Sequence, residues 1–422
     1  MTDRVIVAVD AWEVLDSRGN PTLRVRVDTA DAHGTFSVPS GASTGRYEAV
    51  ERRDGGERFG GKGVLQAAAA VRDVLAPVAC GHEVTEQATI DAALVAADGT
   101  DDLSRLGANA ILGVSGAVAR ATANARDRPL YASLAPDGPG RLPLPMVNLL
   151  SGGAHAPGGL AIQDVLAVPV GADDYSRAIE LVWEVRRALR ARLERQGHRP
   201  LVADEGGFAP VLPDASTAFE LVVDAIEAAG HRPGLDVALG VDVAAGELFD
   251  GSRYDLGGTG PIAPAAMLDT VVGWCDRFPI VTIEDPLDAD DWDGWATLRR
   301  RLEGVQLLGD DFLVTDRVRL DRAIERDAAT AVLVKPNQTG TITRAMGVID
   351  AARAADVAPV VSARSGETAD ATIADLVVAT DAGQLKVGSL ARSERLAKWN
   401  RLLDVAHRTD LPYAGSTALR PT

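Results

Sequence analysis

The sequence predicts an α/β protein in which a smaller α+β domain precedes a closed, TIM-like barrel of the (β/α)8 type. The last two thirds of the chain repeat a short β-branched run, a charged residue at its end and a helical stretch. The first third instead has alternating strand patterns followed by Ala-rich helical patterns. A length of 422 residues, of which 46% are hydrophobic, suits two domains with a sizeable core.

The N-terminal domain is expected over residues 1–135. The stretches "RVIVAVDAWEVLD" and "TLRVRVDTADAHGTFSVPS" alternate apolar and polar residues as strands do, and the second contains a predicted turn at residues 31–34. The stretches "GVLQAAAAVRDVLAPVA" and "GANAILGVSGAVARATANAR" are typical of helices, and the second has enough alanine to be buried on most sides. The Pro- and Gly-rich segment "PDGPGRLPLP" predicts a linker at residues 136–145.

The barrel is expected over residues 146–422, because six apolar runs there end in or near a charged residue. These runs are "ALGVDV" with Asp242, "PIVTIED" with Glu284, "VQLLGDD" with Asp310, "AAVLVK" with Lys335, "APVVSAR" with Arg364 and "GQLKVG" with Lys386. Their spacing fits a strand, a helix and two loops, and active sites of such barrels lie at the C-terminal ends of the strands. A doubly wound open sheet is the alternative, but no Gly-rich phosphate-binding turn opens a first helix.

Composition favours a small-molecule substrate over nucleic acid or a membrane as the main partner. The formal net charge is −17, with 60 acidic and 43 basic residues, and such a surface repels nucleic acid and anionic lipid. The two cysteines, Cys80 and Cys275, show no zinc spacing and no disulfide framework. We find neither a signal-peptide pattern nor an apolar run long enough to span a bilayer, so we expect a cytoplasmic protein.

Three carboxylates at strand ends predict a metal site. Asp242, Glu284 and Asp310 would repel one another if they met uncompensated, and a divalent cation with oxygen ligands resolves the repulsion. All-oxygen ligands favour Mg²⁺. The alternative is that each carboxylate pairs with a surface lysine. Asp311 is an alternative to Asp310 as the third metal ligand, and we prefer Asp310 because of its register with the strand.

Further charged residues suggest acid–base chemistry. Lys335 and Lys386 end strands close to the expected metal, where a lysine should have a depressed pKa and could act as a base; the alternative is a salt bridge with the same carboxylates. Asp204 and Glu205 lie in "VADEGGFAP", a Gly-rich loop that could present an acid or be an ordinary polar loop. His155 lies on another Gly-rich stretch, where a lone histidine is usually solvated.

Many ordered motifs resemble the enolase family, the phosphopyruvate hydratases of glycolysis, over nearly the whole chain. They are "DSRGNPT", "PSGASTG", "GANAIL", "DEGG", "IEDP", "GDD", "KPNQTG", "RSGET", "ATIADL" and "ARSERLAK". The resemblance implies Mg²⁺-dependent interconversion of 2-phosphoglycerate and phosphoenolpyruvate, and a homodimer or a higher homo-oligomer. A Lys or His base with one or two Mg²⁺ ions is the general pattern of the wider enolase superfamily, and the lysine base suggested above is an instance of that pattern.

The resemblance also implies a role for each matching residue. Lys335 would be the base and Glu205 the proton donor. The first Mg²⁺ would be held by the three strand-end carboxylates, Asp242, Glu284 and Asp310. The substrate would be bound by Gln163, Arg364, Ser365 and Lys386, with Arg364 on its phosphate, since a guanidinium fork suits a phosphate. Ser43, in "PSGASTG", would bind a second Mg²⁺, and His155 would approach the substrate.

Two positions depart from the family pattern. This chain has "IQDV" where enolases usually have "LQEF", so Asp164 replaces a glutamate and draws the carboxylate back by about one methylene. It has "SARSGET" where they have "SHRSGET", so Ala363 replaces an active-site histidine. Enolase activity remains the leading hypothesis. The alternatives are a specialised relative that acts on another phospho- or phosphono-carboxylate, resembling carboxyphosphonoenolpyruvate synthases, and a weakly active binding protein.

Overall fold

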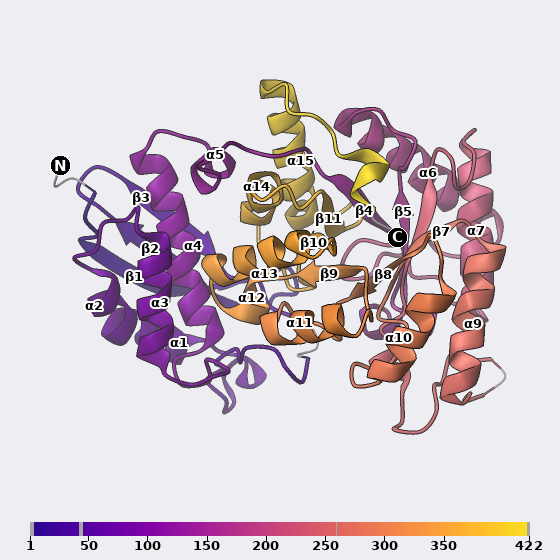
Figure 1. The fold of residues 1–422 in the computed structure, drawn as a ribbon, viewed down its shortest axis with the longest axis horizontal. Coiled ribbons are helices and arrows are strands. Elements are labelled where there is room, and N and C mark those ends of the chain that lie inside the picture. The colour runs from indigo at the N-terminus through magenta and orange to yellow at the C-terminus, as the bar shows by residue number, and fades with distance from the viewer. Residues whose placement is uncertain (1–3, 42–44, 259, 420–422) are drawn as a thin grey trace.

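The computed structural model describes residues 4–41, 45–258 and 260–419, which form an N-terminal sheet-and-helix unit beside a closed barrel (Figure 1). The N-terminal sheet is antiparallel in the order β1-β2-β3, with strands β1 (Ala8–Leu15), β2 (Pro21–Asp28) and β3 (His33–Ser37). Its helices are α1 (Leu65–Ala70), α2 (Ala76–Ala79), α3 (Gln87–Asp98), α4 (Ala108–Ala125) and α5 (Leu130–Leu134), with a π-helical turn at Val71–Leu75 and a 3₁₀ turn at Arg58–Gly61.

Helix α4 packs tightly on this sheet and is buried along most of its length, as its alanine content predicts. The predicted turn at residues 31–34 is displaced, because His33 and Gly34 already belong to β3. A Cβ atom at Gly34 would lie 2.1 Å from the Ala117 carbonyl oxygen of α4. The glycine that looked like a turn signal therefore permits a close approach of helix to strand.

Eight strands close the barrel in the order β10-β11-β4-β5-β6-β7-β8-β9. They are β4 (Leu144–Ser151), β5 (Asp164–Val168), β6 (Ala238–Asp242), β7 (Ile280–Glu284), β8 (Gln306–Gly309), β9 (Ala331–Val334), β10 (Ala358–Ser362) and β11 (Gln384–Gly388). The helices of this part are α6 (Tyr175–Arg195), α7 (Ala215–Ala228), α8 (Ala245–Leu248), α9 (Pro264–Arg277), α10 (Trp292–Arg301), α11 (Arg317–Glu325), α12 (Pro336–Thr339), α13 (Ile342–Ala354), α14 (Thr372–Ala379) and α15 (Ser393–Arg408).

Strand β5 departs from a regular βα repeat. It pairs antiparallel with both β4 and β6, whereas the remaining neighbours in the barrel are parallel. The chain returns from β4 through residues 152–163, which contain only the short 3₁₀ turn Gly153–His155, and α6 and α7 then follow in succession before β6. This reversal brings the first residue of β5, rather than its last, to the end of the barrel where the other strands finish.

The two ends of the barrel differ in character. Apolar side chains fill the interior at the end where the parallel strands begin, among them Leu144, Val168 and Ala358, and this cluster includes Ala414 and Ala418 near the C-terminus. Charged residues lie at the other end, where the parallel strands finish. The segment between α5 and β4 coincides with most of the expected linker at residues 136–145.

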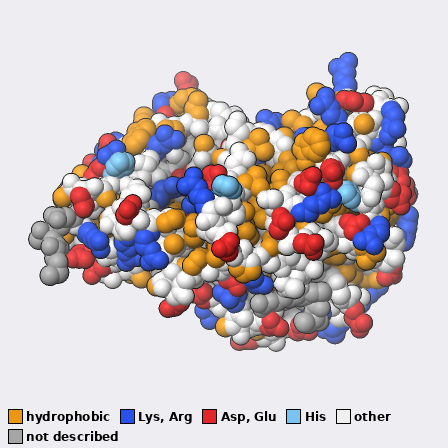
Figure 2. Space-filling view, turned by 90° about the horizontal axis from the view of Figure 1, so that it is seen from above, with side chains coloured by type: hydrophobic (Ala, Val, Ile, Leu, Met, Phe, Trp, Pro, Cys, Tyr) orange, Lys and Arg blue, Asp and Glu red, His pale blue; other side chains and the backbone are white. Residues whose placement is uncertain are grey.

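The surface carries charged side chains of both signs (Figure 2), as the 60 acidic and 43 basic residues of the sequence lead one to expect. Acidic and basic side chains are interspersed on the face seen in Figure 2, with apolar side chains between them. Cys80 and Cys275 are free thiols. None of the helices in the described ranges is both long enough and apolar enough to cross a membrane.

Candidate active site

A cavity lies at the end of the barrel where the parallel strands finish, and it gathers most of the residues singled out above. Its lining includes His155, Gln163, Glu205, Asp242, Asp310, Lys335, Ala363, Arg364, Ser365 and Lys386. Glu48, Glu247, Asp285 and Asp311 also line it. Carboxylates therefore outnumber cationic side chains around this cavity.

The reversed strand β5 explains how Gln163 and Asp164 reach this end. Asp164 pairs in register with Ser151, the last residue of β4, and with Asp242, the last residue of β6. The Gln163 side-chain amide donates to Asp242 Oδ2 at 3.1 Å. In a barrel of parallel strands only, the first residue of a strand would lie at the opposite end.

Lys386 joins two of the three predicted metal ligands. Its Nζ donates to Asp242 Oδ2 at 2.7 Å and to Glu284 Oε2 at 2.6 Å, and all three side chains are buried. Burial alone would lower the pKa of Lys386, but Asp242 and Glu284 outweigh burial and raise it well above its usual range. The salt-bridge alternative is therefore observed, and the expected depression of this pKa is wrong.

Lys335 contacts the third predicted ligand in the same way. It follows β9 directly, and its Nζ forms an ion pair with Asp310 Oδ2, while the Gln338 side-chain amide donates to Asp310 Oδ1 at 3.2 Å. Burial would lower the pKa of Lys335, but Asp310 raises it above its ordinary value. The depressed pKa expected for Lys335 is thus also wrong: Asp310 stabilises the ammonium form.

The carboxylates nevertheless retain unbalanced charge, which fits a divalent cation. Glu284 Oε1 is buried without a hydrogen-bond partner. Burial, followed by the neighbouring Asp242, raises the pKa of Glu284 well above its usual range. Asp285, Asp310 and Asp311 also bring one oxygen each within 4.8 Å of one another. Clustered carboxylate oxygens are the ligands that hard divalent cations take.

Arg364 forms an ion pair with Glu48, a carboxylate for which the sequence predicts no role. Its NH1 donates to Glu48 Oε2 at 2.8 Å and its NH2 to Glu48 Oε1 at 3.2 Å, a two-pronged ion pair in which both side chains are nearly buried. The fork expected to take a phosphate is thus held by a carboxylate of the N-terminal domain. Two-pronged recognition of an oxyanion is what a guanidinium does best.

Glu205 is the acid that its loop presents to the cavity, while Asp204 does not line it. Gly206 has φ +88, and a Cβ there would lie 3.0 Å from the Ala391 carbonyl oxygen, so the glycine lets the loop turn tightly against the end of the barrel. The Asn148 side-chain amide donates to Glu205 Oε2 at 3.2 Å. Burial would raise the pKa of Glu205, but Arg395 and other nearby cations lower it.

His155 and Asp164 form a buried pair beside Glu205. His155 Nδ1 lies 3.3 Å from Asp164 Oδ2 in a geometry that is not a hydrogen bond, and Ser151 Oγ donates to Asp164 Oδ1 at 2.6 Å. Burial would lower the pKa of His155, but the Asp164 carboxylate raises it to about 9. This raised pKa favours the charged imidazole, so His155 is a buried partner of Asp164 rather than a solvated loop residue.

Of the two remaining predicted positions, the structure describes Ala363 but not Ser43. Ala363 lies just beyond β10, lines the cavity and is buried, and its N–H donates to the Lys386 carbonyl at 2.9 Å. Ser43, the expected ligand of a second Mg²⁺, falls outside the described residues.

Sequence reasoning missed several residues of the site. Asp285 adjoins Glu284 in "IED" and accepts from the N–H groups of Asp310 and Asp311 at 3.0 and 2.7 Å, so the acidic doublet was a usable signal. Glu48, which lines the cavity, and Asn148 and Gln338, which donate to Glu205 and Asp310, carried no such signal, because each acts through a partner from another segment of the chain.

We predict that the raised pKa of His155 depends on Asp164. In Asp164→Asn only burial and more distant carboxylates remain, so the imidazole should become neutral at pH 7, while Asp164→Glu should keep it charged. A pKa raised from 6.5 to about 9 gives stability that is present below pH 6.5 and is lost as pH rises through 9. NMR titration of the ring protons and denaturant unfolding across this range measure both effects. An unshifted titration in the parent protein would contradict the assignment.

Comparisons with known proteins agree with this architecture. A family model described as "Enolase, N-terminal domain" matches residues 6–134, and one described as "Enolase, C-terminal TIM barrel domain" matches residues 140–421. A curated relative named "Enolase", from Acidothermus cellulolyticus (strain ATCC 43068 / DSM 8971 / 11B), is 48% identical over 418 residues, which are 98% of this chain and 97% of the relative. These matches confirm the predicted fold class and the resemblance. The chain therefore belongs to the enolase family and is a hydro-lyase of the phosphopyruvate hydratase type.

Proposed function

We propose that the protein catalyses the Mg²⁺-dependent, reversible dehydration of 2-phosphoglycerate to phosphoenolpyruvate. The observation that carries the proposal is the meeting, in one cavity, of Lys335 from the end of β9, Glu205 from the loop after α6 and a cluster of buried carboxylates. A pure binding protein needs neither a buried lysine nor a buried acid in such a cavity. Family membership makes this reaction the leading hypothesis.

The chemistry divides between two side chains. Lys335, as a neutral amine, takes the proton from the carbon next to the substrate carboxylate. Glu205 gives a proton to the β-hydroxyl, the C–O bond breaks, and water and the carbon–carbon double bond of phosphoenolpyruvate result. Proton transfer by a positioned side chain typically contributes ~10²–10⁴-fold to a rate.

Bound Mg²⁺ would be held by Asp242, Glu284 and Asp310, and it would offset the negative charge that develops on the substrate carboxylate. Asp310 then no longer serves mainly to stabilise the Lys335 ammonium, so the pKa of Lys335 should fall toward the range a base needs. Glu205 must likewise gain a proton, and an anionic substrate beside it favours the protonated form.

The remaining residues bind the substrate in this proposal. Arg364 would exchange its contact with Glu48 for the phosphate, with Ser365, Gln163 and Lys386 around the rest of the molecule. His155 and Asp164 would lie beside it, and Ser43 would take part through a second Mg²⁺. We further propose a cytoplasmic homodimer or higher homo-oligomer, with an N-terminal domain over residues 1–135 and a catalytic barrel over residues 146–422.

Replacing Lys335 tests the proposal. Lys335→Ala should lower exchange of the substrate α-proton with solvent by ~10²–10⁴-fold, because the base is missing. Lys335→Arg is the matched control: it keeps a cation beside Asp310 but cannot lose its proton, so it should fail equally. Exchange is followed by NMR in deuterated buffer, with phosphoenolpyruvate formation followed by absorbance. Parent-like exchange in Lys335→Arg would show that only the charge matters.

Ala363 favours one second candidate, a relative that acts on a different phospho- or phosphono-carboxylate. Its methyl group lines the cavity where the resemblance implies an imidazole, so it leaves space for another substituent. In this alternative the shortened Asp164 carboxylate is part of the same adaptation. Gene neighbours and direct assays of both substrate classes would separate the two functions.

The substitution Ala363→His distinguishes the candidates. If the protein is a dehydratase lacking one hydrogen-bonding group, the parent should be slower than enolases that have the histidine, and Ala363→His should recover part of ~10²–10⁴-fold on 2-phosphoglycerate. Ala363→Leu fills the space without an imidazole and should recover nothing. If the alanine makes room for another substrate, both variants should instead suppress the native reaction. A parent already as fast as ordinary enolases would contradict the impaired-dehydratase account.

A further inference from the structure

The "ARSERLAK" segment, residues 391–398, has no role in the chemistry above, yet it carries two buried cations. Arg395 and Lys398 lie three residues apart at the start of α15, and they are 0% and 1% exposed. Residues three apart on a helix share a face, so both side chains point from α15 in the same general direction. Buried charges are costly unless they are well partnered, so their partners indicate what they do.

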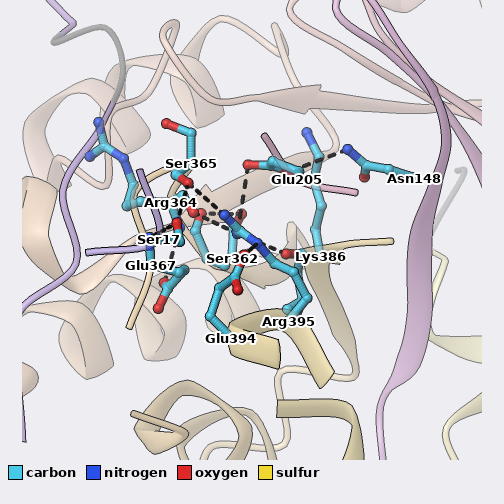
Figure 3. A network of polar contacts seen from close by, with 12 residues as sticks. Ser17, Asn148, Glu205, Ser362, Arg364, Ser365, Glu367, Lys386, Glu394 and Arg395 are labelled. Atoms are coloured by element: carbon cyan, nitrogen blue, oxygen red, sulfur yellow. Dashed lines mark hydrogen bonds and ion pairs between the residues drawn. The ribbon is translucent and has the colours of Figure 1, made fainter. Parts of the chain in front are cut away.

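The Arg395 guanidinium fastens two strand ends of the barrel to each other. Its NH1 donates to the carbonyl of Arg364 at 2.6 Å and to that of Val387 at 3.0 Å, and its NH2 donates to the carbonyl of Ser365 at 2.6 Å. Figure 3 shows the Arg395 side chain beside Arg364 and Ser365. The backbone that carries the proposed phosphate fork is thus fixed to the end of β11.

The same guanidinium faces the proposed proton donor. Arg395 NH1 lies 3.8 Å from Glu205 Oε1, while Asn148 donates to the other carboxylate oxygen (Figure 3). The Ser389 N–H donates to the Glu205 carbonyl at 2.8 Å, which anchors the loop just beyond β11. Glu205 is therefore held between an amide on β4 and a cation on α15.

Lys398 also supports the segment that carries Arg364, but unlike Arg395 it does not contact Glu205. Its Nζ donates at 2.6 Å to both Glu367 Oε2 and the Thr368 carbonyl, and Glu367 Oε1 accepts the Arg364 N–H at 3.2 Å. Among the described residues its polar contacts are to Glu367 and Thr368, not to Glu205. Both cations therefore support the segment around Arg364, but only Arg395 also faces Glu205. Lys398 is therefore the matched comparison for Arg395.

We infer that Arg395 is a positioning residue that sets the Glu205 carboxyl and the Arg364–Ser365 segment at a fixed distance from each other. One planar group with five N–H donors reaches several acceptors at once, which a lysine cannot do with the same geometry. The acid that expels the hydroxyl and the segment that grips the phosphate then move as one unit. The inference rests on the proposed function, since it assigns a role in that reaction.

The test compares two rates in one sample at saturating 2-phosphoglycerate and Mg²⁺: exchange of the α-proton and formation of phosphoenolpyruvate. Lys335 follows β9 directly and is not among the partners of Arg395, so Arg395→Lys should slow elimination much more than exchange. A misplacement of about 1 Å costs on the order of 10²-fold, so we expect the ratio of elimination to exchange to fall by ~10²-fold. Lys398→Met should alter KM and stability but leave this ratio within about threefold of the parent.

The outcomes are distinct. Equal loss of both rates in Arg395→Lys would overturn the inference. So would a fall of the elimination-to-exchange ratio in Lys398→Met as large as the fall in Arg395→Lys, or parent-like rates in both variants. Arg395→Gln, which keeps donors at shorter reach, provides a second variant with the same expectation. If circular dichroism shows that neither Arg395 variant folds, Arg395 is a structural residue and the inference is wrong. A parent that neither exchanges nor eliminates refutes the proposed function itself.

Discussion

The buried contacts of two lysines with the carboxylates around the cavity are the constraint on which the site depends. Lys386 joins Asp242 to Glu284, and Lys335 pairs with Asp310, so one lysine links the ends of β6, β7 and β11 and the other links the ends of β8 and β9. Breaking a buried ion pair by removing one partner typically costs about 3–5 kcal/mol. The lysines thus stabilise a set of carboxylates that would otherwise repel one another, and the same carboxylates are those proposed to bind Mg²⁺. In the proposed function, Mg²⁺ would take the carboxylate oxygens that the lysines now contact, so a lysine whose pKa is raised in this structure can still be proposed as the base.

Two features of the fold complete this arrangement. The reversal of β5 places Gln163 and Asp164 beside Asp242, where a parallel strand would have delivered its last residue instead. The N-terminal domain contributes Glu48 to the Arg364 fork, and its residue Ser40 exchanges backbone hydrogen bonds with Gly366 at 2.7 and 2.8 Å. The segment around Arg364 therefore contacts the N-terminal domain on one side and helix α15 of the barrel domain on the other.

The sequence predicted much of the fold and the part of the site that follows a simple rule. Charged residues at the ends of apolar strands were recognisable because parallel barrel strands all finish on one face. The place of Gln163 and Asp164 in the site was predicted only from the family resemblance, because no sequence pattern indicates that β5 runs antiparallel to its neighbours. Glu48 and Arg395 act over long sequence separations, on groups whose position only the folded chain defines. The pKa shifts of the two lysines were predicted with the wrong sign, because a metal and a second ammonium were expected to dominate, whereas the paired carboxylates raise both pKa values.

The most direct test of the central claim is the proton balance of Mg²⁺ binding. Metal ligands must be deprotonated, and burial next to Asp242 raises the pKa of Glu284 well above its usual range. Calorimetric titration with Mg²⁺ at pH 7, in two buffers of different ionisation enthalpy, gives the number of protons released. The account predicts saturable binding with net release of about one proton, because burial and Asp242 favour the protonated form of Glu284 and the cation would require its carboxylate. Saturable binding without proton release, or no saturable binding, would contradict it.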